Sequence, residues 1–266
     1  MKTRLISVAC MLPFIIFLVL GGIPLLIITM LVSAAALFEY FKGFENLEIK
    51  ASKPIAGALL LVLYGIMFGA LTMADSLDLF NDLLGLWVFA TLGVSLLLII
   101  LDKGHNILGP TYTMVGLIYI GYSIAHVYLL DYRFESLVWL PFIIAYLADA
   151  GGFFAGMYFG KHRLSPALSP KKTIEGAIGG IIASFVGSVV FALIACQTNI
   201  FNCIILGIIG GVIAELGDLT ASAFKRKMGI KDYSSIIPGH GGVLDRIDSV
   251  IFVAPFVYYF AAILFK

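Results

Sequence analysis

Nine apolar stretches, each long enough to cross a bilayer as a helix, occupy most of this chain. They cover residues 5–21, 23–42, 54–73, 82–101, 107–130, 136–160, 173–196, 200–224 and 249–265. A helix crosses the hydrocarbon core with about 20 mostly apolar residues. Lipid offers no hydrogen-bond partners to backbone N–H and C=O groups, so such segments span as helices. The sequence therefore predicts an all-α, polytopic integral membrane bundle of about nine transmembrane helices.

Composition excludes an ordinary soluble domain. Hydrophobic residues make up 61% of the chain and charged residues 12%, with a mean hydropathy of +1.05. Soluble proteins average about 45–50% apolar and about 25% charged residues. The first apolar stretch follows Met1–Arg4 as in a signal peptide, but no small-x-small cleavage site separates it from the second stretch. We therefore interpret it as a retained first helix.

The basic residues indicate the orientation. If the N-terminus is cytoplasmic and nine spans alternate, all of the 17 basic residues except Arg133 and Lys266 fall on the cytoplasmic side. The opposite loops carry the acids Asp75, Asp78, Asp82, Asp131 and Glu135. The positive-inside rule therefore predicts N-in/C-out topology. We expect the membrane to be the cytoplasmic or inner cell membrane.

The charge pattern also suggests that the chain has two regions with different roles. Residues 1–135 are expected to form a lipid-facing or dimerisation scaffold, and residues 136–266 a catalytic region with cytoplasmic loops 161–172 and 225–248, together one membrane domain. We interpret the lone His126 as a packing residue. The thiols of Cys10, Cys196 and Cys203 have no metal-ligand spacing and fit buried inert residues, although a Cys196–Cys203 disulfide stays open.

Three acids stand out inside the apolar stretches of the C-terminal half: Asp149, Glu215 and Asp218. Ionisable groups inside membrane helices are costly and usually functional. At 100° per residue, one arc of about 100° holds Glu215, Asp218, Ser222, Lys225 and Arg226. The acids would then lie deeper in the membrane than the cations. The alternative is that the acids only pair with basic residues of neighbouring helices.

The polar segment from Lys225 to Asp248 combines features that suit a polyphosphate. Gly239, Gly241 and Gly242, around His240, allow backbone N–H groups to approach an anion. Asp245 and Asp248 stand three residues apart at the start of the last helix, and Mg²⁺ commonly bridges carboxylates and substrate phosphates. The alternative is a basic membrane anchor with a glycine turn.

The other cytoplasmic loop contains a second candidate anion site. Ser169 and Pro170 predict a helix start, with serine as N-cap and proline at the first position. Lys171, Lys172 and Thr173 would then lie in the first turn of that helix, where phosphate binds readily. The preceding stretch carries Gly152, Gly156 and Gly160 at a spacing of four, which predicts close helix packing.

These motifs resemble the phosphatidate cytidylyltransferase family. The signature Ser-x2-Lys-Arg-x4-Lys-Asp-x-Ser-x2-Ile-Pro-Gly-His-Gly-Gly-x2-Asp-Arg-x-Asp is complete from Ser222 to Asp248, and Ser-Pro-Lys-Lys-Thr-x-Glu-Gly runs from 169 to 176. The resemblance is close over roughly 140–250. It implies an enzyme that joins CTP to phosphatidic acid, giving CDP-diacylglycerol and pyrophosphate. It also implies Mg²⁺, as one ion or two, a homodimer in the bilayer, and no nucleic-acid partner.

The resemblance also implies roles for individual residues near the cytoplasmic face. The catalytic group would be Asp218, Asp245, Lys225 and Arg226. The metal would be surrounded by acids from the set Asp218, Asp245, Asp149, Glu215 and Asp248. The substrates would contact Ser169, Lys171, Lys172, Thr173, Glu175, Ser222, Lys231, Asp232, Gly239, His240, Gly241, Gly242 and Arg246.

Three other functions remain open from the residues alone. A related cytidylyltransferase could act on another lipid phosphate, such as an ether lipid. A transporter would also explain acids inside helices, but transporters often show broken helices at matching positions in two halves, and here the polar groups are confined to one half. A purely structural membrane scaffold would not explain Gly239, Gly241 and Gly242 in the loop between the last two apolar stretches.

Overall fold

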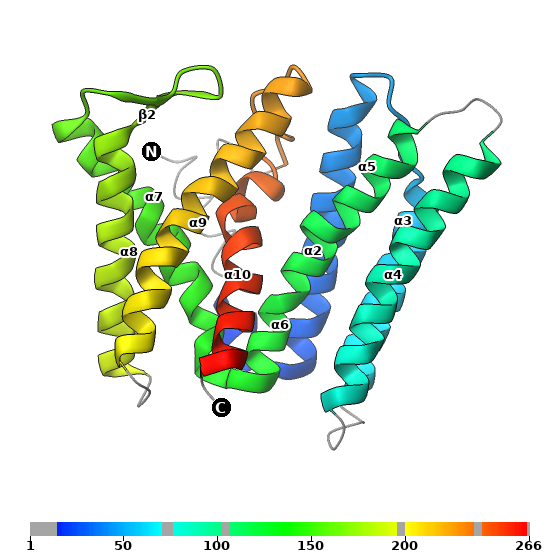
Figure 1. The fold of residues 1–266 in the computed structure, drawn as a ribbon, viewed down its shortest axis with the longest axis horizontal. Helices are drawn as coiled ribbons and strands as arrows, with labels where there is room; N and C mark the ends of the chain where they lie inside the picture. Colours follow the sequence, from blue (N-terminus) through cyan, green and yellow to red (C-terminus); the bar gives the residue numbers. More distant parts are fainter. Residues whose placement is uncertain (1–14, 71–76, 103–106, 196–199, 237–240, 265–266) are drawn as a thin grey trace. The chain divides into compact units, whose positions relative to one another are not determined.

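The computed structural model describes residues 15–70, 77–102, 107–195, 200–236 and 241–264. Its main helices are α2 (Gly22–Glu45), α3 (Lys53–Ala70), α4 (Leu77–Leu101), α5 (Leu108–Gly116), α6 (Ser123–Phe134), α7 (Leu140–Phe159), α8 (Ile174–Ile194), α9 (Ile200–Lys227) and α10 (Leu244–Leu264) (Figure 1). A π-helical segment, η1 (Leu117–Tyr122), joins α5 to α6, and a 3-10 segment, η2 (Glu135–Trp139), joins α6 to α7. Two short strands, β1 (Arg163–Ser165) and β2 (Ser169–Thr173), precede α8.

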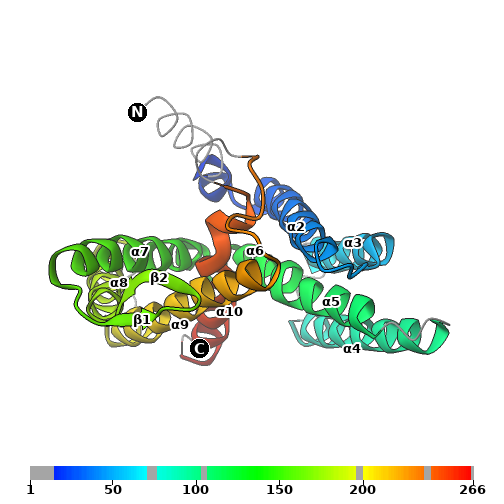
Figure 2. The same cartoon turned by 90° about the horizontal axis from the view of Figure 1, so that it is seen from above.

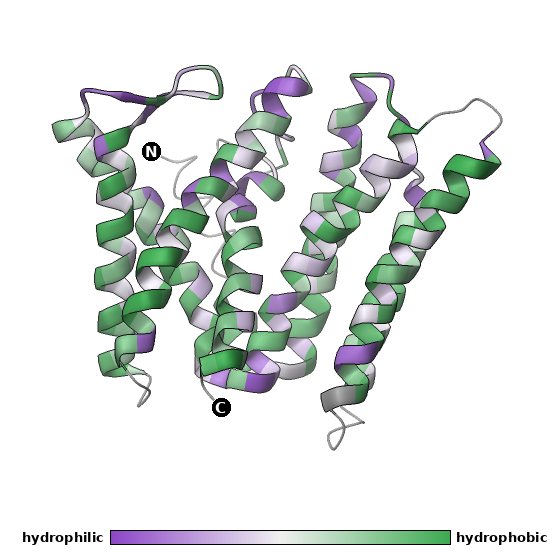
Figure 3. Cartoon of the chain, viewed as in Figure 1, coloured by the Kyte–Doolittle hydropathy of each residue, from purple (hydrophilic) through white to green (hydrophobic). Residues whose placement is uncertain are grey.

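The described helices confirm a multi-pass membrane protein. Six helical runs are long and apolar enough to cross a bilayer: Gly22–Glu45, Leu79–Leu101, Leu108–Phe159, Ile174–Ile194, Ile200–Lys227 and Leu244–Leu264. The apolar helix Lys53–Gly69 is shorter. Apolar residues dominate the helices, whereas hydrophilic residues gather in the hairpin and at the end of α9 (Figure 3). Nine spans and N-in/C-out orientation stay predictions, and most of the first predicted stretch, 5–21, lies outside the described residues.

The run Leu108–Phe159 is too long for one crossing. Its 52 residues would extend about 78 Å at about 1.5 Å per residue, against a hydrocarbon core of about 30 Å. The α-helical pattern breaks at η2, where Glu135 has a φ of 38°. This break falls between the two stretches predicted at 107–130 and 136–160.

The chain divides into two compact units, and the first contains residues 1–128 and 228–245. Within this unit α2 packs against α3, α5 and η1. Tyr40 packs edge-on against Phe44, with ring centroids 4.8 Å apart. Phe44 also contacts Tyr112, at 3.9 Å. His126 is buried on α6 and its Nδ1 lies 2.8 Å from the Tyr122 carbonyl oxygen, which fits the packing role expected for it.

The second unit contains residues 129–227 and 246–266, and glycines hold its helices at close range. A Cβ on Gly176 would lie 2.9 Å from the Gly152 carbonyl oxygen and 3.3 Å from Gly156 Cα, and a Cβ on Gly180 would lie 2.7 Å from the Ala148 carbonyl oxygen. Side chains at these positions would push α7 and α8 apart. The close packing predicted from Gly152, Gly156 and Gly160 is therefore confirmed, and glycines of α8 supply the other half of the contact.

The start of α8 differs from the prediction. We expected a helix from Ser169 and Pro170, but Ser169–Thr173 forms β2, which pairs antiparallel with β1. Pro170 is tolerated there because a two-stranded hairpin leaves each strand with an unpaired edge. Thr173, with φ −123° and ψ 156°, is the N-cap, and its Oγ1 accepts a hydrogen bond from the Gly176 N–H. Pairing with β1 outweighs the local helix-start signal.

Candidate active site

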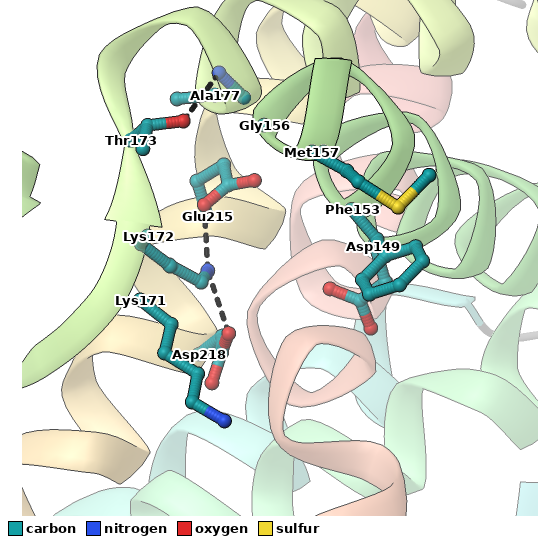
Figure 4. Close-up of a pocket in the computed structure, with 12 residues that line it drawn as sticks. Asp149, Phe153, Gly156, Met157, Lys171, Lys172, Thr173, Ala177, Glu215 and Asp218 are labelled. Carbon is teal, nitrogen blue, oxygen red and sulfur yellow. Dashed lines mark hydrogen bonds and ion pairs between the residues drawn. The ribbon is translucent and has the colours of Figure 1, made fainter. Parts of the chain in front are cut away.

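A cavity of about 370 Å³ lies inside the second unit, between α7, α8, α9 and β2. Its polar lining comes from Asp149 on α7, Lys171 and Lys172 on β2, and Glu215 and Asp218 on α9 (Figure 4). Its remaining lining is largely apolar or backbone, from Gly152, Phe153, Gly156, Met157, Thr173, Gly176 and Ala177. Opposite charges and an apolar wall therefore meet in one cavity.

Lys172 lies between the two acids of α9. Its Nζ is 2.7 Å from Glu215 Oε2 and 2.6 Å from Asp218 Oδ2 (Figure 4). Burial lowers the pKa of Lys172, but the charges and hydrogen bonds of Asp218 and Glu215 outweigh it and raise the pKa above that of an ordinary lysine. The lysine is thus a permanent cation that compensates two carboxylates. Asp149 is within electrostatic range of the same three groups.

Glycine packing brings further acids and cations to this cluster. A Cβ on Gly217 would lie 2.8 Å from the Asp248 carbonyl oxygen, so α9 and α10 cross closely one residue before Asp218. The buried Asp248 is within electrostatic range of Asp218, Asp149 and Lys225. Ser222 Oγ lies 3.5 Å from Asp218 Oδ1. The residues predicted on one face of α9 therefore do share a face.

The hairpin is fastened to the ends of α8 and α9. Glu175, in the first turn of α8, accepts hydrogen bonds from the backbone N–H groups of Lys161 and His162, and its Oε1 is 2.6 Å from His162 Nδ1. Arg226 Nε donates to the Leu168 carbonyl oxygen at 3.2 Å. Figure 2 shows the hairpin lying across the ends of both helices. Glu175 and Arg226 thus orient the strand that carries Lys171 and Lys172.

The first unit holds the described part of the glycine loop, the segment between α9 and α10: residues 228–236 and 241–243. Asp245 Oδ2 accepts hydrogen bonds from the Tyr233 N–H at 2.8 Å and the Gly242 N–H at 2.9 Å. Gly241 has a φ of +84°, a left-handed conformation that favours glycine. Lys231 and Asp232 are exposed on this loop. Asp245 therefore stabilises the loop through these two hydrogen bonds. The sequence predicted a metal-binding role for Asp245 but not these contacts.

The predicted site residues thus fall into two groups. The second unit contains Asp149, Ser169, Lys171, Lys172, Thr173, Glu175, Glu215, Asp218, Ser222, Lys225, Arg226, Arg246 and Asp248, and the first contains Lys231, Asp232, Gly241, Gly242 and Asp245. Gly239 and His240 lie outside the described residues. Sequence analysis missed Glu39, a buried acid on α2 that contacts the glycine loop. An acid inside the stretch 23–42 was the available signal.

The donor chemistry of the cavity fits Mg²⁺. No three acids, histidines or cysteines among the described residues form a ready metal cage. Mg²⁺ does not need one, because it usually binds through one or two carboxylates together with substrate phosphates. Asp149, Glu215 and Asp218 line one cavity, and these carboxylates would be the residues to hold the ion there.

Comparison with known proteins decides the family. A model of the cytidylyltransferase family matches residues 2–264. The chain belongs to the cytidylyltransferase family. This confirms the resemblance predicted from the two motifs and makes the protein a nucleotidyltransferase enzyme.

Two relatives of this cytidylyltransferase are similar over nearly its whole length, and a third over less than half of it. The phosphatidate cytidylyltransferase of Staphylococcus haemolyticus (strain JCSC1435) is 31% identical over 260 residues, 96% of each chain. That of Bacillus subtilis (strain 168) is 29% identical over 277 residues, 99% of this chain and 98% of the relative. That of Haemophilus influenzae (strain ATCC 51907 / DSM 11121 / KW20 / Rd) is 48% identical over 124 residues, 45% of this chain and 43% of the relative.

Proposed function

We propose that this cytidylyltransferase transfers the cytidylyl group of CTP to phosphatidic acid, giving CDP-diacylglycerol and pyrophosphate. The three relatives described above are all named phosphatidate cytidylyltransferase. The structural observation that carries the proposal is the cavity of the second unit. It offers lysines for phosphate groups beside Phe153 and Met157, which are exposed and apolar. A lipid phosphate needs both kinds of surface.

The chemistry needs no protein nucleophile. A phosphate oxygen of phosphatidic acid attacks the α-phosphorus of CTP in line. The bond from that phosphorus to the oxygen bridging to the β-phosphorus breaks, and pyrophosphate leaves with the bridging oxygen. A phosphate monoester has a second pKa of about 6. The attacking group is therefore already ionised at neutral pH and requires no strong general base. The protein then has to position both substrates and stabilise negative charge.

The basic residues supply that stabilisation. Lys171 and Lys172 are proposed to bind phosphate groups in the cavity, and Lys225 and Arg226 to do so from the end of α9. Arg246 is also proposed as a substrate contact. In the first unit the glycine loop is proposed to bind the nucleotide, through Lys231, Asp232 and its backbone N–H groups.

Mg²⁺, as one ion or two, is part of the proposal. Asp218, Asp149 and Glu215 would hold it in the cavity, and Asp245 and Asp248 are the other proposed acids. A bound ion would neutralise charge on the phosphoryl oxygens. Three acids, Asp149, Glu215 and Asp218, and two lysines, Lys171 and Lys172, line the cavity, so the acids outnumber the cations by one and added positive charge would be accommodated.

The setting is proposed as well: a homodimer in the cytoplasmic or inner membrane, with nine spans, N-in/C-out, and the site near the cytoplasmic face. A second substrate class, another lipid phosphate such as an ether lipid, would use the same groups and is separated only by substrate competition. Transport is disfavoured because the polar groups of the cavity lie in one half of the chain, whereas transporters often have matching broken helices in two halves.

The deciding experiment uses protein purified in detergent with phosphatidic acid, Mg²⁺ and CTP labelled at the α-phosphate. We expect label in a chloroform-soluble product, and its absence with EDTA or in Asp245→Asn. Labelled lipid that forms equally well in EDTA would contradict the metal proposal. Folded protein that labels no lipid would contradict the substrate, and ether-lipid phosphates would then be compared.

A further inference from the structure

Glu39 is a buried carboxylate that the proposed chemistry does not use. It lies near the C-terminal end of α2 and is 1% exposed. Its Oε1 accepts hydrogen bonds from Ser234 Oγ at 2.6 Å and from the Val243 N–H at 3.0 Å. Its Oε2 accepts one from the Leu244 N–H at 2.9 Å. One side chain of α2 therefore holds both ends of the described glycine loop.

Two of these donors stand at the start of α10, where backbone N–H groups have no partner within the helix. The N-terminus of a helix carries partial positive charge, so an anion is favoured there. Hydrogen bonds to a carboxylate are also stronger than those to a neutral acceptor. Glu39 thus caps α10 from another helix and from more than 200 residues away in sequence, counting from the separations of 204 and 205 residues to Val243 and Leu244.

Gly242 explains why the carboxylate can come so close. A Cβ at this position would lie 2.6 Å from Glu39 Oε1 and also collide with Oε2. The backbone at 242 needs no positive φ, unlike Gly241. A larger residue at 242 would therefore displace the Glu39 carboxylate from these hydrogen bonds. The loop is held by Asp245 from within and by Glu39 from outside.

We propose that Glu39 is a positioning residue for nucleotide binding: from α2 it holds Ser234, Val243 and Leu244, described residues on the two sides of the glycine loop, in place for CTP. The inference rests on the proposed function, in which this loop binds CTP. A loop that is already ordered loses less conformational entropy when its ligand binds. Removing the anchor should therefore weaken CTP binding more than phosphatidate binding or the chemical step.

The first variant is Glu39→Gln, which keeps the size of the side chain. Its amide would direct N–H donors at backbone N–H donors, so at least one of the three contacts is lost and the charge disappears. We expect the KM and Kd for CTP to rise about tenfold or more, as for loss of one strong hydrogen bond. The KM for phosphatidic acid and the kcat should change less than about twofold on the same scale.

Two further variants test the same contact. Ser234→Ala removes only one donor and should give a smaller rise in the CTP Kd. Gly242→Ala should weaken CTP binding in the natural protein through its collision with Glu39. In a Glu39→Ala background, where that collision is absent, Gly242→Ala should lower CTP affinity by a smaller factor than it does in the natural protein. Such non-additivity is expected of residues in contact.

Hydrogen exchange gives a reading that does not depend on activity. The amides of Val243 and Leu244 should exchange faster in Glu39→Gln. The matched control is Glu45→Gln, the same change on the same helix, at an exposed residue paired with Lys53. It should alter neither amide exchange nor CTP affinity.

The outcomes separate the two proposals. Wild-type protein that binds CTP without making lipid product would contradict the proposed function, while a raised CTP Kd in Glu39→Gln would still support the anchor. Unchanged exchange and unchanged CTP affinity would overturn the anchor. Faster exchange without a change in CTP affinity, or equal rises in both KM values, would reduce Glu39 to a structural residue and overturn it too.

Discussion

The charged side chains of the cavity stabilise one another, because Lys172 forms ion pairs with Glu215 and Asp218. Lys172 is 22% exposed, Glu215 11% and Asp218 24%, so water reaches this ion cluster only in part. Removing one member of such a pair leaves an uncompensated charge, which costs more than the pair itself contributes. Stability and activity therefore respond differently to each member of the cluster.

Lys172→Met should destabilise the protein by about 2 kcal/mol, within the range for leaving partly buried charged groups unsatisfied. Adding Glu215→Gln removes one of the stranded charges and should restore part of the loss. The measurement is the midpoint of thermal unfolding in detergent. A double variant less stable than Lys172→Met alone would contradict the compensating role of the lysine.

The same ion cluster sets a pH dependence. The pKa of Lys172 is raised in the folded protein, so its contribution to stability is fully present below about pH 10.4, the ordinary lysine value. The contribution is lost only as pH rises through the higher folded-state pKa. As pH rises from 6 to 9, the stability difference between wild type and Lys172→Met should not shrink, because Lys172 keeps its proton and the carboxylates left without it in the variant become more ionised. A difference that shrinks across this window would show that Lys172 loses its proton there.

Asp218→Asn tests the metal proposal at one residue. We expect kcat to fall by about 100-fold or more, the scale seen when one electrostatic stabiliser is removed. A second reading is the thermal stabilisation by Mg²⁺ with CTP, which should be present in wild type and reduced in the variant. Asp82→Asn, an exposed acid on α4, is the control. Full activity in Asp218→Asn would remove this acid from the site.

At the scale of elements, the packing of α7 on α8 positions the cavity. Gly180→Ala would place a Cβ 2.7 Å from the Ala148 carbonyl oxygen, next to Asp149, and 3.2 Å from Glu215 Oε1. Overpacking of this kind costs about 1–3 kcal/mol, and we expect activity to fall with stability. Gly93→Ala on α4 meets nothing within 4 Å. It should be neutral or stabilise by up to about 1 kcal/mol, through helix propensity. Equal thermal midpoints for the two variants would contradict the packing argument.

The helices could be predicted because an apolar stretch of about 20 residues in lipid satisfies its backbone hydrogen bonds as a helix. Hydropathy alone locates each such stretch. The hairpin could not. Ser169 and Pro170 favour a helix start locally, and only pairing with residues 163–165 turns them into a strand. The acids of the cavity stood out because ionisable residues are rare in spanning helices. The ion-pair partners of these acids could not be predicted, because Lys172 and Glu215 are 43 residues apart in sequence and come into contact only in the folded chain.

At the scale of the molecule, one contact within the first unit bears on the topology. A Cβ on Gly43, at the end of α2, would touch Met228 and come within 3.5 Å of Ile230, just after α9. The two positions therefore lie at the same membrane face, and the chain between them must cross an even number of times. If the shorter helix α3 crosses once, as predicted, and α4, α8 and α9 each cross once, the run Leu108–Phe159 crosses twice or not at all. Its length and apolar composition favour two crossings.

Cysteine labelling tests this topology and its orientation together. In a background without Cys10, Cys196 and Cys203, single cysteines would replace Lys50 and Lys227, both expected in the cytoplasm, and Asp82, expected outside. All three side chains are exposed. A maleimide that cannot cross membranes should label Asp82→Cys in intact cells, and the other two only after permeabilisation, because a bilayer excludes the charged reagent. Labelling of Lys50→Cys and Lys227→Cys on opposite sides would contradict the even count of crossings. Labelling of both in intact cells, with Asp82→Cys protected, would keep the even count and invert the orientation, placing the basic loops and the proposed CTP site outside the cytoplasm.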